Sequence, residues 1–116
     1  MGGITGMSTI NQMLGQGVAT TNPVSIYSPG SGDEVVIKNI TCCNTTSNIV
    51  TLSLYRNNDG TTYDTTTAVK YQQSMAAKTT EQWDVYYCMN NSSGNFAIEA
   101  GASNSLTVTL DGIEFA

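Results

Sequence analysis

Histidine is absent from the 116 residues, so the chain lacks the side chain that proteins use most often as a general base and as a metal ligand. A Ser–His–Asp or Cys–His catalytic arrangement is therefore excluded. Nine acidic residues remain, and most of them fall at expected turns or strand ends, where carboxylates are normally solvated. We therefore expect a protein that is not an enzyme and that binds no metal or cofactor.

Positive charge is scarce and scattered, with four Lys and Arg residues in all and a formal net charge of −5. Binding to nucleic acid or to an anionic membrane needs clustered cations, so neither is an expected partner. No apolar run approaches the length of a membrane span, and the N-terminus lacks the basic start and apolar stretch of a signal peptide. We therefore expect a chain that is used without secretion. Charged residues make up only 11% of the chain, which leaves few groups to repel other surfaces and favours a homo-oligomer.

Cysteine occurs three times, an odd number that does not suit the paired cysteines of a secreted disulfide scaffold. Cys42 and Cys43 are adjacent, so in a strand their side chains point to opposite faces. Our first interpretation is that the cysteines are small buried side chains without a bond. The alternative is a disulfide between Cys42 and Cys88, between Cys43 and Cys88, or between subunits.

Alternating apolar and polar residues, separated by turns rich in Asn, Ser, Thr and Gly, fill the chain from Val24 onward. This pattern predicts strands at 24–28, 34–43, 48–56 and 80–89, around Phe96 and Ile98, and from Leu106 to the end. The expected fold is an all-β antiparallel β-sandwich or jelly roll of about seven to eight short strands. The residues expected to form its core are Ile40, Val50, Leu52, Leu54, Trp83, Val85, Phe96, Ile98, Leu106, Val108 and Leu110.

Two strands change phase along their length, which predicts a β-bulge in each. One bulge is expected near Lys38 and Asn39, and the other at Asp111 and Gly112, so that Ile113 and Phe115 follow on the inner face. Residues 61–71 are β-prone but irregular, and residues 72–79 are expected to be a connection. The run 57–60 (NNDG) predicts a hairpin turn, and it lacks the first ligand of a calcium loop.

Residues 1–22 differ from the rest because they carry no charge and combine glycine with methionine and isoleucine. We interpret 1–22 as an extended N-terminal arm and 23–116 as the β-sandwich domain. The alternative is a frayed terminus. The residues expected to contact a neighbouring subunit are Met7, Ile10, Met13 and Leu14.

Three segments carry a resemblance to a known family: VVIKNITCCNTT at 35–46, VTLSLY at 50–55 and NSLTVTLDGIEF at 104–115. Together they resemble small β-sandwich virion proteins of tailed bacteriophages, over roughly residues 24–116. The resemblance implies a capsid decoration (cement) protein that stabilises the head by bridging capsomers. It also implies the major capsid protein or other virion proteins as partners, and location in a virion assembled in the host cytoplasm. The sequence departs from the family at Ser93-Gly94-Asn95, where a Gly-Asp turn is usual, and at Cys42 and Cys43.

Two other functions are compatible with the same residues. A neck, tail or fibre-associated module of the particle would share the fold and the lack of catalysis. A carbohydrate-binding β-sandwich would expose Trp83 or several tyrosines on one face. Alternation places Trp83 and Tyr87 on one face of their strand and Tyr86 on the other, which favours core packing of Trp83 instead.

Overall fold

Eight strands form the described part of the chain, and the computed structural model describes residues 11–115. No helix in these residues is long and apolar enough to cross a membrane. The strand bounds are β1 (Asn11–Val18), β2 (Val24–Tyr27), β3 (Glu34–Asn44), β4 (Val50–Asn57), β5 (Ala68–Met75), β6 (Thr80–Met89), β7 (Asn95–Ala100) and β8 (Leu106–Phe115).

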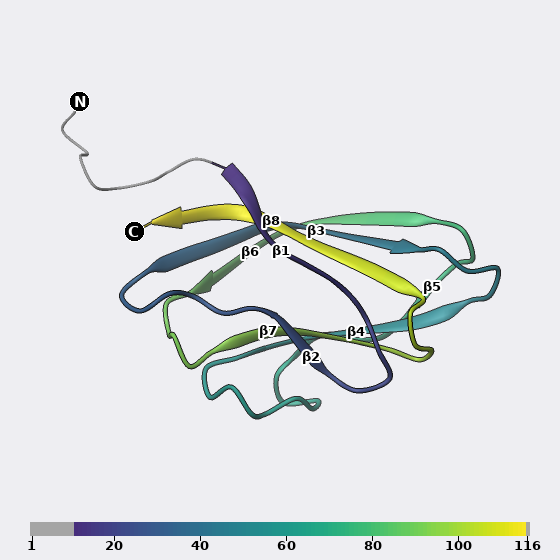
Figure 1. The fold of residues 1–116 in the computed structure, drawn as a ribbon, viewed down its shortest axis with the longest axis horizontal. Coiled ribbons are helices and arrows are strands. Elements are labelled where there is room, and N and C mark those ends of the chain that lie inside the picture. The colour runs from purple at the N-terminus through teal and green to yellow at the C-terminus, as the bar shows by residue number, and fades with distance from the viewer. Residues whose placement is uncertain (1–10, 116) are drawn as a thin grey trace.

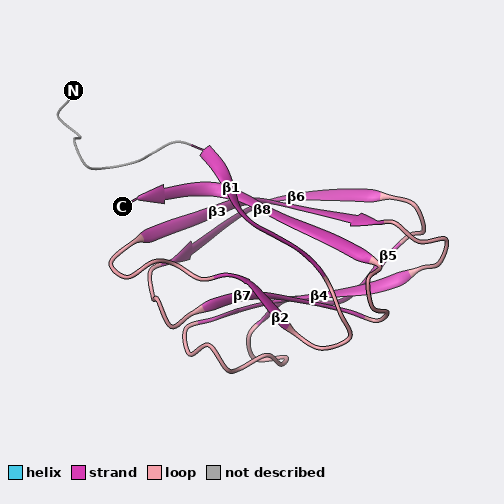
Figure 2. Cartoon of the chain, in the orientation of Figure 1, coloured by secondary structure: helices cyan, strands magenta, loops and turns pink. Residues whose placement is uncertain are grey.

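The strands form two four-stranded antiparallel sheets with the orders β1-β8-β3-β6 and β2-β7-β4-β5. Figures 1 and 2 show them as two layers. Every connection except that between β4 and β5 carries the chain from one sheet to the other. This alternation between two antiparallel sheets of an eight-stranded sandwich is the arrangement of a jelly roll. The expected all-β sandwich is thus confirmed.

The core lies between the two sheets and is built from the inward side chains of each strand. Its centre includes Ile40 on β3, Leu52 on β4 and Phe96 on β7, all fully buried. Of the side chains expected in the core, Trp83 and Val85 alone are only half-buried, because β6 is an edge strand and leaves one side of them uncovered. The buried ones are Ile40, Val50, Leu52, Leu54, Phe96, Ile98, Leu106, Val108 and Leu110.

A bulge in β3 lets both halves of this strand face the core. Its pairing with β8 shifts register between Ile37 and Asn39, which leaves Lys38 as the extra residue. Ile37 before the bulge and Ile40 after it are therefore both buried, although their spacing would place them on opposite faces of a regular strand. The predicted bulge near Lys38 and Asn39 is confirmed.

The bulge predicted in β8 at Asp111 and Gly112 is wrong. Burial alternates without a break from Leu106 to Gly112, so Ile113 and Phe115 lie on the outer face rather than the inner one. The extra residues belong to the neighbouring strands, Lys38 in β3 and the residue between Met13 and Gly15 in β1. Gly112 lies on the inner face, but it has no side chain that would identify this face in the sequence. The apolar–polar alternation is therefore interrupted at Gly112 in the sequence, although the strand is regular.

Residues 11–22 are part of the sandwich rather than an arm outside it. β1 pairs with β8 over its whole length, from Asn11 opposite Ile113 to Val18 opposite Thr107. Leu14 packs against the core, whereas Met13 points outward and is 60% exposed. The separation of an arm at 1–22 is therefore corrected for its second half, and Met7 and Ile10 lie outside the described residues.

The segment 68–75 is a strand, although 72–79 was expected to be a connection. β5 is the edge of the second sheet and pairs with β4 through two register shifts. Within it Gln72 has a φ of 50°, which interrupts the regular alternation of a strand. This irregularity hides the strand from a periodicity argument.

Candidate interaction surfaces

The described residues hold no group of three or more Cys, Asp and Glu side chains that could bind a metal ion. Two of the acids, Asp59 and Asp64, instead order the loop between β4 and β5. The Thr62 hydroxyl and the Thr61 and Thr62 amides donate to Asp59, which lowers the pKa of this carboxyl to about 2. These carboxylates act as acceptors in a turn and are not poised for proton transfer.

Apolar side chains gather at one end of the outer face of the β1-β8-β3-β6 sheet. Val36 lies between Ile113 on β8 and Cys88 on β6 in register. Tyr86, 69% exposed, and Phe115 line a depression of about 330 Å³ here together with Val36 and Cys88, and Glu34 and Asn90 add polar groups to its lining. We call these five residues, Val36, Tyr86, Cys88, Ile113 and Phe115, the apolar end.

Most of the remaining outer face, apart from β1, is polar and carries direct side-chain hydrogen bonds between strands. Gln16 on β1 donates to the Thr109 hydroxyl at 2.8 Å, and Gln82 on β6 donates to the Thr41 hydroxyl at 3.2 Å. These pairs satisfy each other's polar groups across the strands. Asp84 on β6 and Asp111 on β8 lie in register with Asn39 on the same face. A partner that docks on this face would therefore meet one apolar region with polar and acidic surroundings.

β1 is one of the two edge strands of the same sheet, because it pairs on one side only. Met13 and Val18 are exposed there, at 60% and 48%. An unpaired edge with exposed apolar side chains is a place where another chain can add contacts. Of the four residues expected in the contact arm, Met13 is thus exposed, whereas Leu14 is half-buried against the core.

The three cysteines are free, so the disulfide between Cys42 and Cys88, which was the alternative to unbonded cysteines, is not formed within the chain. Cys42 lies opposite Glu81 in the β3–β6 ladder and Cys88 lies opposite Val36, near the other end of it. Cys43 lies opposite Thr80, so it cannot reach Cys88 either. A bond between subunits stays a prediction.

The cysteines should differ strongly in reactivity. Burial raises the pKa of the Cys42 thiol to about 12, whereas Cys88 is exposed and Cys43 is intermediate. Because the thiolate is the reactive form, iodoacetamide at neutral pH should label Cys88 first, Cys43 more slowly, and Cys42 only after denaturant is added. Peptide mass spectrometry over a time course measures this order. Equal labelling of Cys42 and Cys88 in the folded protein would contradict the burial of Cys42.

Two cationic side chains lie over aromatic rings of β6, at the side of the sandwich formed by the edge strands β5 and β6. The Lys70 ammonium lies 4.4 Å from the centroid of the Trp83 ring, and the Arg56 guanidinium carbon lies 4.6 Å from that of Tyr87. Each pair covers an aromatic face that would otherwise be wet. An exposed aromatic platform built on Trp83 is therefore not present. Lys70 points inward from the edge strand β5, and a charge in this position disfavours pairing of that edge with another chain.

The outer face of the β2-β7-β4-β5 sheet is half covered by the loop between β4 and β5. The Tyr63 ring packs edge-on against Tyr55, with centroids 6.3 Å apart, and the Asn95 amide donates to the Tyr63 hydroxyl at 2.8 Å. The side chain of Asn57 donates to the carbonyl of Thr62 at 2.9 Å and so ties the loop to the end of β4. The loop leaves the other half of this face open.

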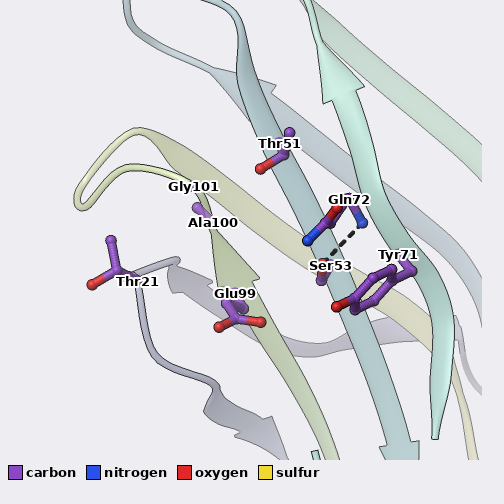
Figure 3. A pocket seen from close by; sticks show the side chains of 8 residues that line it. All are labelled: Thr21, Thr51, Ser53, Tyr71, Gln72, Glu99, Ala100 and Gly101. Atoms are coloured by element: carbon purple, nitrogen blue, oxygen red, sulfur yellow. Dashed lines mark hydrogen bonds between the residues drawn. The ribbon is translucent and has the colours of Figure 1, made fainter. Parts of the chain in front are cut away.

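A polar depression of about 280 Å³ occupies that open half. Ser53 on β4 lies opposite Glu99 on β7, and Tyr71 and Gln72 on β5 form one wall (Figure 3). Thr51 and Thr21, with Ala100 and Gly101, complete the lining. Sequence analysis missed this site because it placed Tyr71 and Gln72 in irregular segments. The available signal was the polar alternation of Thr51 and Ser53 along β4.

Hydrogen bonds hold the floor of the depression in place. The Gln72 amide N–H donates to the Ser53 hydroxyl at 3.0 Å, and the Tyr55 hydroxyl donates to Oε1 of Glu99 at 2.6 Å. Burial and the bond to Glu99 raise the pKa of Tyr55 to about 12, so this phenol stays a donor at neutral pH. Both acceptors lie on central strands, which fixes their positions.

No family model and no curated protein sequence matches the chain. Its structure is similar to a protein of the Bacillus endospore appendages, which are disulfide-linked pili, with 16% identity, a TM-score of 0.55, and coverage of 100% of this chain and 95% of the other. A protein of the T13 particle of IBDV is 9% identical with a TM-score of 0.55, over 95% of this chain and 31% of that one. A protein of the cyanophage Pam1 capsid is 14% identical with a TM-score of 0.49, over 97% and 89%. The first two comparisons show a shared fold.

Proposed function

We propose that the chain is a non-enzymatic structural protein of a virion, and specifically a capsid decoration protein that bridges capsomers of a tailed-phage head. The observation that carries this proposal is the apolar end, where Tyr86, Phe115 and their neighbours line an open depression on the outer face of the sheet. Exposed and half-buried apolar side chains that gather on one face in this way are typical of a site of protein contact. The low share of charged residues and the occurrence of jelly rolls in viral capsids support the same assignment.

The N-terminal segment would extend this contact. Asn11, the first described residue, pairs with Ile113 of the apolar end, so residues 1–10 are joined to the sheet at this point. Ten extended residues span up to about 35 Å, enough to reach a neighbouring subunit. Met7 and Ile10 would then add apolar area on that neighbour. Because such binding requires the assembled shell, it would stabilise the shell by mass action.

Co-sedimentation with purified particles of the virus that encodes the chain tests this proposal. Deletion of residues 1–10 and the substitution Tyr86→Asp should each weaken binding about tenfold or more, because both remove apolar contact area at the interface. Tyr71→Asp is the matched control, since Tyr71 is similarly exposed but lies on the other sheet. Binding that is unchanged in both test variants would contradict the proposed contact surface.

A fibre or tail-associated subunit is the second candidate. It is favoured by the likeness to a pilus protein over the full length of this chain and 95% of the other, and by the free edge of β1. Electron microscopy of the concentrated protein separates the candidates. Filaments of the isolated chain would favour the fibre role, whereas a particle that carries copies in proportion to its capsomers would favour decoration.

A further inference from the structure

We propose that the polar depression on the β2-β7-β4-β5 sheet is a binding site for one neutral sugar residue. This site lies on the other sheet from the apolar end and is independent of it. Its volume, about 280 Å³, is close to the lower end of small-molecule sites, which run from about 300 to 1,000 Å³. A single ring with its hydroxyl groups is the scale of ligand that suits such a space.

The lining carries the groups that recognise a polyhydroxylated ligand. Thr51 and Thr21 contribute hydroxyls, Gln72 a side-chain amide, and Glu99 a carboxylate, so donors and acceptors converge on one space. None of the lining residues is Lys or Arg, which disfavours phosphate, sulfate or an acidic sugar beside Glu99. A neutral ring that offers several hydroxyls fits this set.

Tyr71 supplies the apolar complement. Its side chain is 51% exposed, and Figure 3 shows its ring beside Ser53 and Gln72 at the wall of the depression. An aromatic ring next to hydrogen-bonding groups matches a sugar, which has C–H faces as well as a polar rim. Trp83, the residue first expected in such a role, is instead covered by Lys70.

The site is organised before any ligand arrives. Gln72 has a φ of 50°, uncommon for a residue other than glycine, and its N–H bonds the buried Ser53 hydroxyl. This irregular turn of β5 holds Tyr71 and Gln72 at the wall, in the way that bulges re-aim side chains near functional sites. Tyr55 meanwhile holds one oxygen of Glu99 and leaves the other for a ligand.

The competing occupant is a cationic side chain of a partner protein. An arginine binds best with two parallel hydrogen bonds to both carboxylate oxygens, and on Glu99 it would have to share Oε1 with the Tyr55 hydroxyl. A cation would also leave the hydroxyls and the amide of the wall without matched acceptors. The lining therefore favours a sugar.

Titration of the full chain by ¹⁵N–¹H NMR with methyl glycosides of glucose, galactose, mannose and N-acetylglucosamine tests the proposal. At least one should shift the amides of Ser53, Gln72 and Gly101 in a saturable way at millimolar concentration. Glu99→Gln keeps an acceptor for Tyr55 but removes the charge, and should weaken binding about tenfold. Tyr71→Ala should weaken it similarly, and Tyr86→Ala should not. Dispersed spectra of the variants verify folding.

Three results would overturn the proposal. The first is that none of the four glycosides shifts these amides. The second is binding that survives both Glu99→Gln and Tyr71→Ala. The third is that Nα-acetyl-lysine methylamide shifts the same amides while the glycosides do not, which would assign the site to a cationic partner. None of these outcomes depends on particle binding, so they leave the virion proposal to its own test.

Discussion

Replacement of Gly112 by alanine is expected to lower the free energy of unfolding by about 3 kcal/mol, the upper range for overpacking a core. A Cβ at this position would lie 2.1 Å from the carbonyl oxygen of Val36, 2.9 Å from a methyl group of Leu14 and 3.0 Å from the Cα of Ile37. Two of these atoms belong to the backbone of β3, which pairs on both sides and cannot move without loss of hydrogen bonds. Urea unfolding followed by Trp83 fluorescence measures the change.

Gly32→Ala is the matched control for this substitution. Gly32 has a φ of +81°, and a Cβ there would meet nothing within 4 Å, so only backbone strain is added. That strain costs about 1 kcal/mol. An equal loss in the two variants, with unchanged dependence on urea, would show that close packing around Gly112 does not decide the effect.

The strands that sequence analysis located correctly are those whose inner faces are marked by large side chains. β6 is bounded as predicted, from Thr80 to Met89, because burial alternates at every residue along it. β3 was found despite its bulge, since Ile37 and Ile40 identify the inner face on either side. In each strand, the side chains that contact the opposite sheet are large and apolar, and this produces a visible alternation in the sequence.

β1 could not be predicted in this way because its partner is remote. Gln16 on β1 bonds Thr109 on β8, 93 residues away. The glycines of β1 lower both helix and strand propensity, so the local sequence favours neither structure. Pairing with β8 therefore decides that this segment is a strand. The strand exists because β8 presents a free edge to it. Its identity is therefore a property of the tertiary structure.

The two candidate sites also differ in how far local sequence could predict them. Alternation in β6 correctly separated Tyr86 from Trp83 and Tyr87, and this is why one residue of the apolar end could be placed outward from sequence. The polar depression combines Ser53, Tyr71 and Glu99 from three strands. Only the order β7-β4-β5 brings them together, and strand order is not written in the local pattern.

The sandwich thus carries its two candidate surfaces on opposite sheets. The apolar end involves β3, β6 and β8, and the polar depression involves β4, β5 and β7. A protein that lies on a particle through one sheet would leave the other directed away from that contact. Particle attachment and sugar binding are therefore compatible in one chain, and Tyr86 and Tyr71 are the residues that separate them experimentally.

The substitution Asn44→Asp is expected to lower the free energy of unfolding by about 4 kcal/mol at neutral pH. The buried Asn44 amide donates to the carbonyls of Asn48, Met75 and Ala76 at 2.9, 3.0 and 3.2 Å, while its oxygen accepts from Thr46. It thereby joins the turn after β3 to the end of β5. A carboxylate at this position would place negative charge against three carbonyl oxygens.

This loss should shrink in acid, and the sign follows from proton binding. The surroundings of Asp at position 44 would disfavour the charged form, so the pKa of the carboxyl would be higher in the folded state than in the unfolded state. The folded variant then binds a proton more readily than the unfolded one. Its free energy of unfolding therefore rises as the pH falls toward about 3.9, the pKa of Asp in the unfolded state. Asn48→Asp is the control, because it adds the same charge at an exposed side chain. If urea unfolding gave equal losses for the two variants at pH 7, or a loss in Asn44→Asp that stayed constant in acid, the carbonyl contacts of Asn44 would not be what stabilises this turn.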